Sequence, residues 1–402
     1  MMKKLFFSGI LFVINFFLIR AQETQKFKSF WNKGYHLESN DGNFKMKFGG
    51  RIQQHWSFTS QDETIDNLFG KPINGSEFRR IRFYNAGTLY NFISYKLQLE
   101  FAGGSTTVKD IHISIDKLPI VGKFTIGHFK EPFGLDQYNS SNDMSFIERA
   151  SNFDITPGRN NGFMFSNTAF NENITWAIGT FRDTDNFGKT SVGNNYNFTG
   201  RITVLPVFNN EKNKLLHLGL AYSYRTPDES KYSLESRPEA HLLTSYINTG
   251  MIDLVDNVQL TGFEAALVLN PFSLQSEYIH SKVNRKKLVE NYNFYGYYIE
   301  ASYFLTGEHK NYSKKVGYFK RVSPKSNFNP TGKGIGAIEL VARFSSTDYS
   351  DKSIEGGILN DMTIGVNWHL NPATKFSFDY TSAKLVSIGN SNIFQMKFQV
   401  AF

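Results

Sequence analysis

The C-terminal segment places the strongest limit on what this chain can fold into. Residues 392–402 read NIFQMKFQVAF, with apolar side chains at every second position, namely Phe394, Met396, Phe398, Val400 and Phe402. A period of two over this length indicates a β-strand with one apolar face and one wet face. The strand ends on an aromatic residue, which is typical of the last strand of a bacterial outer-membrane β-barrel. We therefore expect a protein of the bacterial outer membrane, in contact with its lipid.

The N-terminus has the parts of a secretion signal. Lys3 and Lys4 precede an apolar run at 5–19, and Arg20 and Ala21 follow it. This pattern predicts a signal peptide at 1–21 and one barrel domain at 22–402. A membrane anchor is the alternative, but the run is shorter than the ~18–20 residues that span a bilayer, and Arg20 closes it. The chain has no cysteine, which excludes disulfide bonds, thiolate metal sites and a lipid-bearing cysteine.

Similar alternation recurs along the whole chain. Clear segments lie at 44–58, 80–83, 93–101, 110–116, 216–225, 362–370 and 375–380. Weaker ones lie at 122–130, 160–169, 173–182, 196–206, 258–269, 272–282, 293–305 and 336–346. With the terminal strand, the pattern predicts an all-β transmembrane antiparallel barrel of about sixteen strands, a size that leaves a water-filled lumen. A soluble β-sandwich is the alternative, but the strands have aromatic apolar faces and no second sheet is needed to cover them.

The connections alternate between short turns and long polar loops, as such barrels require. We predict long outer loops at 59–76, 131–160, 183–195, 226–257 and 347–358, and a short lead into the first strand at 22–42. One connection breaks this pattern, because 306–335 falls on the periplasmic side yet is long and rich in lysine. Either it hides another pair of strands, or the barrel carries a basic periplasmic segment.

Composition agrees with a barrel. The mean hydropathy of −0.36 resembles that of a soluble protein, because only every second strand residue of a barrel faces lipid. The 39 phenylalanines and 20 tyrosines suit the aromatic girdles at the two membrane interfaces. Removal of the predicted signal peptide takes away Lys3, Lys4 and Arg20 and no acid, so the net charge falls from +8 to +5. With so mild an excess, the placement of the charges matters more than their sum.

Basic residues gather on the predicted lumen face of the first strands. Arg51, Arg80, Arg82 and Lys96 form this wall, together with Lys45, Lys47 and, through closure of the barrel, Lys397; Glu100 is the one acid on it. A charged side chain facing lipid at mid-depth costs ~2–4 kcal/mol, so these residues must face water. The planar fork of arginine suits a phosphate oxyanion. The alternative is an ordinary set of solvated lumen charges, balanced by acids elsewhere.

The loop at 131–160 is the second candidate feature. A loop of about thirty residues is usually functional. Folded into the lumen, it would narrow the pore opposite the basic wall and bring Lys130, Arg149 and Arg159 to the constriction, with Ser140, Ser141 and Ser145 as neutral donors. The acids of the same loop weaken this interpretation, and a solvated surface loop is the alternative.

Several segments, in order, resemble the phosphate-selective porin O/P family. They are GNFKMKFGGRIQ at 42–53, FRRIRF at 78–83, GHFKEPFGLD at 127–136, FIERA at 146–150, PGR at 157–159, FLTGEHKNY at 304–312 and GAIELVARF at 336–344. The resemblance spans nearly all of the chain after the signal peptide. It implies a sixteen-stranded homotrimeric porin with an inward-folded third loop, and anion selectivity that arises from basic lumen residues. Phosphate preference is a family expectation.

These features lead to a hypothesis of passive diffusion of small anions, with inorganic phosphate or polyphosphate favoured. A weakly selective general porin and a non-conducting surface receptor or adhesin are the alternatives. We expect no enzyme, no cofactor and no metal, because the chain lacks G-x-S-x-G and H-E-x-x-H motifs and its nine histidines have no ligand spacing. Net charge and export both disfavour nucleic-acid binding.

Overall fold

A computed structural model describes residues 26–190, 193, 195–286 and 289–402 of the chain. The signal peptide predicted at 1–21 lies outside these residues and stays a prediction. Within the described part, no helix is long and apolar enough to cross a membrane.

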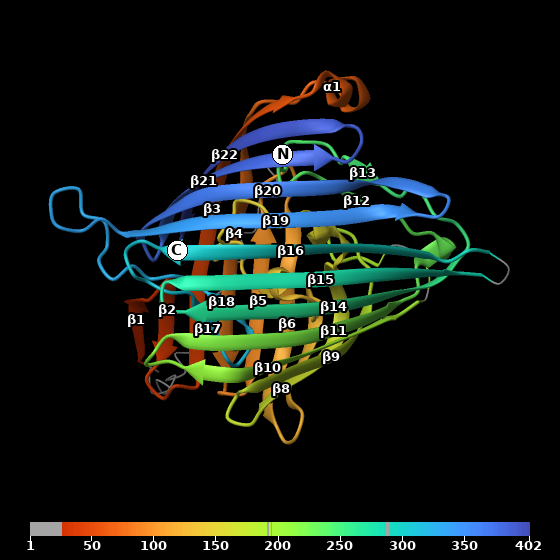
Figure 1. Cartoon of the computed structure of the whole chain (residues 1–402). Helices are drawn as coiled ribbons and strands as arrows, with labels where there is room; N and C mark the ends of the chain where they lie inside the picture. Colours follow the sequence, from red (N-terminus) through yellow and green to blue (C-terminus); the bar gives the residue numbers. More distant parts are fainter. Residues whose placement is uncertain (1–25, 191–192, 194, 287–288) are drawn as a thin grey trace, which may run out of the picture.

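Sixteen antiparallel strands form a closed barrel, as predicted (Figure 1). Each strand pairs with the next, and β22 closes the sheet by pairing with β3, from Ala401 opposite Arg51 to Ser391 opposite Gln61. The barrel strands are Phe44–Gln61 (β3), Gly75–Leu89 (β4), Ile93–Glu100 (β5), Thr107–Leu118 (β6), Gly122–Lys130 (β7), Arg159–Ala169 (β8), Ile174–Arg182 (β9), Asn197–Asn209 (β10), Lys214–Arg225 (β11), Val255–Leu269 (β14), Phe272–Arg285 (β15), Tyr292–Phe304 (β16), Ala337–Asp351 (β19), Ile354–Asn371 (β20), Thr374–Leu385 (β21) and Gly389–Ala401 (β22).

The alternation along each strand sorts side chains between lipid and lumen. On β3, Ile52 and Phe58 are 42% and 47% exposed, whereas Gln53 and His55 between them are 0% and 3% exposed. The polar side chains turn inward because lipid offers them no hydrogen-bond partner. The faces predicted from the sequence for the terminal strand hold as well, since Phe394 is exposed and Lys397 is buried.

The segment before the first barrel strand is a hairpin and not the plain lead that we expected. Phe27–Trp31 (β1) pairs with Tyr35–Ser39 (β2), and β2 pairs in turn with the beginning of β3. β22 stops short of this part of β3: Phe402 exchanges two backbone hydrogen bonds with Gly50, at 2.7 and 3.1 Å. The hairpin therefore takes over the edge of β3 that the last strand leaves free.

The prediction of a long loop at 347–358 is wrong. β19 runs to Asp351 and β20 begins at Ile354, so only two residues turn between them. The polar residues of 347–358 suggested a loop, but they form the ends of β19 and β20. Backbone hydrogen bonds between two strands tolerate polar side chains wherever neither face of the strands meets lipid. Inside the barrel, Tyr349 of this hairpin is fully buried and packs edge-to-face on Phe294.

The third outer loop folds into the lumen, as predicted. It spans 131–158 and contains the short helix Leu135–Tyr138 (α2) and the 3-10 turn Ser151–Ile155 (η1). Phe133, Leu135 and Ile147 are fully buried inside the barrel.

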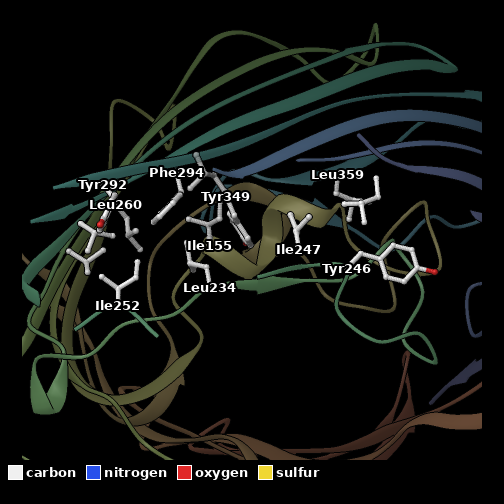
Figure 2. Packing of buried hydrophobic residues seen from close by; sticks show 14 of the residues in the cluster. Ile155, Leu234, Tyr246, Ile247, Ile252, Leu260, Tyr292, Phe294, Tyr349 and Leu359 are labelled. Carbon is white, nitrogen blue, oxygen red and sulfur yellow. The ribbon is translucent and has the colours of Figure 1, made fainter. Parts of the chain in front are cut away.

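A second outer loop, 226–254, also folds inward, which the sequence did not suggest. It holds the 3-10 turn Asp228–Ser230 (η2) and the paired strands Glu235–Ser236 (β12) and Ile247–Asn248 (β13). Its apolar residues Leu234, Tyr246 and Ile252 pack on inward-facing residues of β14, β16 and β20 (Figure 2). Part of the lumen is therefore an ordinary hydrophobic core.

The remaining helix, Glu63–Phe69 (α1), belongs to the first outer loop and contacts β22.

The unusual periplasmic connection adds no strand to the barrel. It runs through 305–336 and contains the small hairpin Asn311–Ser313 (β17) with Tyr318–Lys320 (β18). This hairpin enters the lumen, where Phe319 is buried and its backbone N–H donates to Asn139 Oδ1 of the third loop at 3.0 Å. The second of the two interpretations, a basic periplasmic segment, is thus the correct one.

Candidate functional site

A cavity of about 950 Å³, called here the conduit, lies inside the barrel. It follows the inner wall of β3 to β10, from Arg79 near the outer loops to Lys117 at a periplasmic turn. The third loop and the β17–β18 hairpin form its other side, through Tyr138 and Tyr318 among others. All seven residues selected from the sequence line it, namely Arg51, Arg80, Arg82, Lys96, Lys130, Arg149 and Arg159.

The conduit is strongly cationic. Its lining contains thirteen lysines and arginines but only two carboxylates, Asp110 and Glu172. A low-dielectric wall with one sign of charge concentrates ions of the opposite sign.

The balancing acids lie on the opposite wall, where the third loop covers them. Glu277 on β15 accepts the backbone N–H of Asp136 at 2.6 Å, and Asp379 on β21 accepts that of Ile147 at 2.7 Å. Glu339 on β19 accepts the hydroxyl of Ser145 at 2.9 Å. The acidic wall therefore holds the loop in place, and the basic wall is left facing water.

Arg51 and Lys130 have neutral hydrogen-bond partners and no carboxylate within ion-pair distance among the described residues. Arg51 Nη1 donates to the hydroxyls of Ser141 at 2.7 Å and Ser140 at 3.3 Å, and its Nε has no partner among the described residues. The Lys130 ammonium donates to the backbone carbonyls of three consecutive residues, 137–139. No carboxylate therefore contacts either side chain, and the unpartnered Arg51 Nε is buried.

Other cations are paired. Arg82 Nε donates to Glu100 Oε2 at 2.5 Å. Asp110 lies between Lys96 at 2.5 Å and Arg159 at 2.7 Å, so one carboxylate orients two cations. Arg149 donates to two backbone carbonyls of its own loop and stacks on Phe153, with 4.7 Å between guanidinium carbon and ring centre.

Six of the thirteen lining cations were not selected from the sequence, namely Arg79, Lys109, Lys117, Lys123, Arg201 and Lys315. Arg79 and Lys109 were missed because strict alternation gives them the wrong face. Each lies at a β-bulge. On β4, Phe78 pairs with Gln54 and Arg80 with Gln53, which leaves Arg79 as the extra residue. On β6, Val108 pairs with Leu99 and Ile111 with Leu97, so β6 has one residue more than β5 in this interval. Lys109 and Asp110 therefore both line the conduit. A bulge re-aims a side chain, and no residue type in these segments marks one.

Lys397 is not part of the conduit, although the sequence placed it on the basic wall. Its ammonium lies beneath the third loop, 3.4 Å from the backbone carbonyl oxygen of Phe146, and is 1% exposed. Lys45 and Lys47 lie nearer the periplasmic rim and do not line the conduit either. The alternation rule gave the correct face for these residues but could not show what covers it.

A second cavity of about 360 Å³ lies on the outer side of the conduit. Arg79, Arg80, Arg149 and Phe153 line both spaces and so mark the boundary between them. Glu148 lines only the outer one. Its carboxylate is 2.8 Å from Arg79 Nε, 3.4 Å from Arg80 Nη2 and 3.6 Å from His55 Nδ1.

Glu148 stays ionised at this boundary. Burial acts to raise the pKa of its carboxyl, but the charges of Arg79 and Arg80 outweigh burial and hold that pKa well below its ordinary range. A permanent negative charge thus lies against the outermost arginines of the conduit.

A closed sixteen-stranded barrel with lipid-facing apolar residues and a lumen narrowed by its third loop defines an outer-membrane porin. The model of the family described as "Phosphate-selective porin O and P" matches residues 46–402. The chain belongs to this family of non-enzymatic channels of the bacterial outer membrane, as its resemblance to the family predicted.

Individual relatives are distant. Porin O of Pseudomonas aeruginosa is 24% identical over 400 residues, covering 89% of this chain and 87% of that protein. An anion-selective porin from Comamonas acidovorans superposes with a TM-score of 0.53 at 13% identity, over 89% of this chain and all of that one. The trimer form of OmpT from Vibrio cholerae gives 0.52 at 11% identity, over 89% and 99%. At these identities the structural matches show the fold alone.

Proposed function

We propose that this porin lets small anions diffuse passively across the outer membrane and favours phosphate or polyphosphate. The observation that carries the proposal is the charge of the conduit, with thirteen cations and two carboxylates in its lining. Glu277, Glu339 and Asp379 of the opposite wall lie under the third loop. Glu100 and Glu148 contact part of the basic wall but are not among the lining residues, so the surface that a permeating ion meets is mainly cationic.

The seven selected residues would act as weak anion sites in series. Arg80 and Arg149 lie at the outer boundary, where they also line the outer cavity. Arg82 pairs with Arg51 across β3 and β4, and Lys96, Lys130 and Arg159 complete the lining. Arg51 is a candidate for direct contact, because it lines the conduit and its hydrogen-bond partners are two serine hydroxyls and no carboxylate. Conduction needs binding that is favourable enough for entry and weak enough for release, which several shared sites provide.

The descriptions of the family and of a structural neighbour also support anion transport. The family is named for phosphate selectivity, and the Comamonas acidovorans porin is described as anion-selective. A homotrimer is part of the proposal, since the family resemblance implies one and the Vibrio cholerae OmpT relative is described as a trimer.

A planar-bilayer titration tests the phosphate preference. Chloride current through single channels of the purified protein is recorded while phosphate is added. Under this proposal, phosphate blocks the current in a saturable manner. A large ohmic conductance that phosphate leaves unchanged would favour a general porin, and the complete absence of channels would favour a receptor barrel.

A further inference from the structure

Glu148 lies at the boundary between the outer cavity and the conduit. Among the lining residues, Arg79, Arg80, Arg149 and Phe153 are shared by the outer cavity and the conduit. The Glu148 carboxylate occupies the hydrogen-bonding face of the first two, with Arg79 Nε and Nη2 at 2.8 and 3.4 Å and Arg80 Nη2 at 3.4 Å. A carboxylate in this position makes the same contacts that a mobile oxyanion would make.

The main chain of Glu148 is held from the opposite wall. Arg343 Nη2 donates to its backbone carbonyl at 3.0 Å, and the preceding residue, Ile147, donates its N–H to Asp379 at 2.7 Å. Only the side chain reaches across to the basic wall. The carboxylate can therefore leave the arginines by rotating its own side chain, without movement of the loop.

We infer that Glu148 is a tethered internal anion that competes with permeating anions for Arg79 and Arg80. This inference rests on the proposed anion conduction. Two adjacent arginines without a competitor would hold a phosphate too tightly for efficient transport. A carboxylate that returns to them whenever the ion moves on weakens net binding and speeds release, as a pore requires.

The test compares Glu148→Gln with the wild type in the planar bilayer. Loss of the competitor lowers the half-blocking phosphate concentration by roughly threefold or more, the scale of a single ion pair, and lengthens each blocking event. A purely structural role predicts the reverse, because a loosened loop would widen the pore and weaken the block. Weaker block or unchanged block in this variant overturns the inference.

Glu148→Asp separates contact from charge. It keeps the negative charge but is one methylene shorter, so its carboxylate no longer reaches both arginines. Competition predicts that it behaves like Glu148→Gln, whereas behaviour like the wild type would mean that only the field of the charge matters and would overturn the inference. Folding of each variant is checked by heat-modifiable gel mobility. If Glu148→Gln does not fold, Glu148→Asp takes its place in the test.

Asp154→Asn is the matched control. Asp154 is a carboxylate of the same loop and the same outer cavity, but its hydrogen-bond partner is Ser236 and not an arginine. We expect Asp154→Asn to have the same half-blocking phosphate concentration as the wild type. A wild type without anion selectivity would refute the proposed function itself, whereas a selective wild type with an unaltered Glu148→Gln block refutes only the role of Glu148.

Discussion

Arg343 on β19 and Glu239 in the loop 226–254 form an ion pair inside the barrel, with side chains only 3% and 1% exposed. The same arginine donates to the backbone carbonyl of Glu148 in the third loop and stacks on Phe146, 4.1 Å from the ring centre. Ser345 and Thr363 donate to Glu239 as well, each at 2.7 Å. One wall residue thus anchors both inward-folded loops.

Loss of this anchor is expected to release the loop 226–254. Glu239→Gln removes the nearer of the two carboxylates beside Arg343 and leaves Glu300 at 3.8 Å. Breaking a buried pair costs up to about 3–5 kcal/mol. We predict a larger single-channel conductance and faster tryptic cleavage after Lys231, an exposed residue of this loop, in reconstituted protein. Glu235→Gln, an exposed carboxylate of the same loop, is the control and keeps wild-type cleavage. Equal cleavage rates in Glu239→Gln and the control would contradict the anchoring role.

The double variant Arg80→Gln with Arg82→Gln tests the basic wall. It removes two cations from the conduit and leaves their partners Glu148 and Glu100 without them. The anion-to-cation permeability ratio should fall by roughly threefold or more, because the field of the lining weakens. Lys282→Gln with Lys352→Gln removes the same charge from exposed positions outside the conduit. If both double variants keep the wild-type ratio, those arginines are only solvated lumen charges.

Arg201 on β10 is predicted to keep the β17–β18 hairpin in the lumen. It makes two hydrogen bonds of 2.7 Å to Glu264 and one of 2.8 Å to the backbone carbonyl of Gly317. In Arg201→Gln the segment 305–336 should become more accessible, measured by hydrogen exchange of its peptides. Lys315→Gln changes a side chain of the same hairpin connection that is 77% exposed, and it leaves that exchange unchanged. Protection equal to the wild type in Arg201→Gln would show that other contacts suffice.

The contact between the two inward-folded loops should depend on pH. Burial raises the pKa of Asp154 to about 6, and Ser236 of the loop 226–254 donates to it at 2.9 Å. Burial makes the folded state bind the proton more tightly, and the hydrogen bond from Ser236 opposes this only in part. The stability that comes from burying Asp154 is therefore fully present below about pH 4 and is lost as pH rises through 6. Hydrogen exchange of the loop 226–254, corrected for the intrinsic rate, should therefore accelerate between pH 5 and pH 7. In Asp154→Asn this acceleration disappears; its persistence there would assign the effect to another group.

Alternation alone predicted the barrel and most of its basic wall. Arg51, Arg80, Arg82 and Lys96 all face the conduit as their parity required, because a lipid-facing charge is too costly at mid-depth. The same rule failed at Arg79, where a bulge shifts the phase of β4 without a residue type that marks it.

The lumen contents were harder to predict. Loops that fold inward bury their side chains against residues distant in sequence, such as Glu239 on Arg343 or Phe319 beside Asn139, and periodicity does not report such contacts. Leu234, Tyr246, Ile247 and Ile252 were the available signal in the loop 226–254, since a solvated loop rarely carries so many apolar residues. The third loop covers Lys397 through contacts of the same long-range kind, which the sequence pattern does not report.

The most direct test of the central claim is the reversal potential of the purified wild-type protein in a planar bilayer under a potassium chloride gradient. The cationic conduit predicts a potential close to the chloride equilibrium value, which moves toward zero in the Arg80→Gln, Arg82→Gln variant. A wild-type potential at zero, or at the potassium side, would contradict the claim that the basic wall of β3 to β8 selects anions.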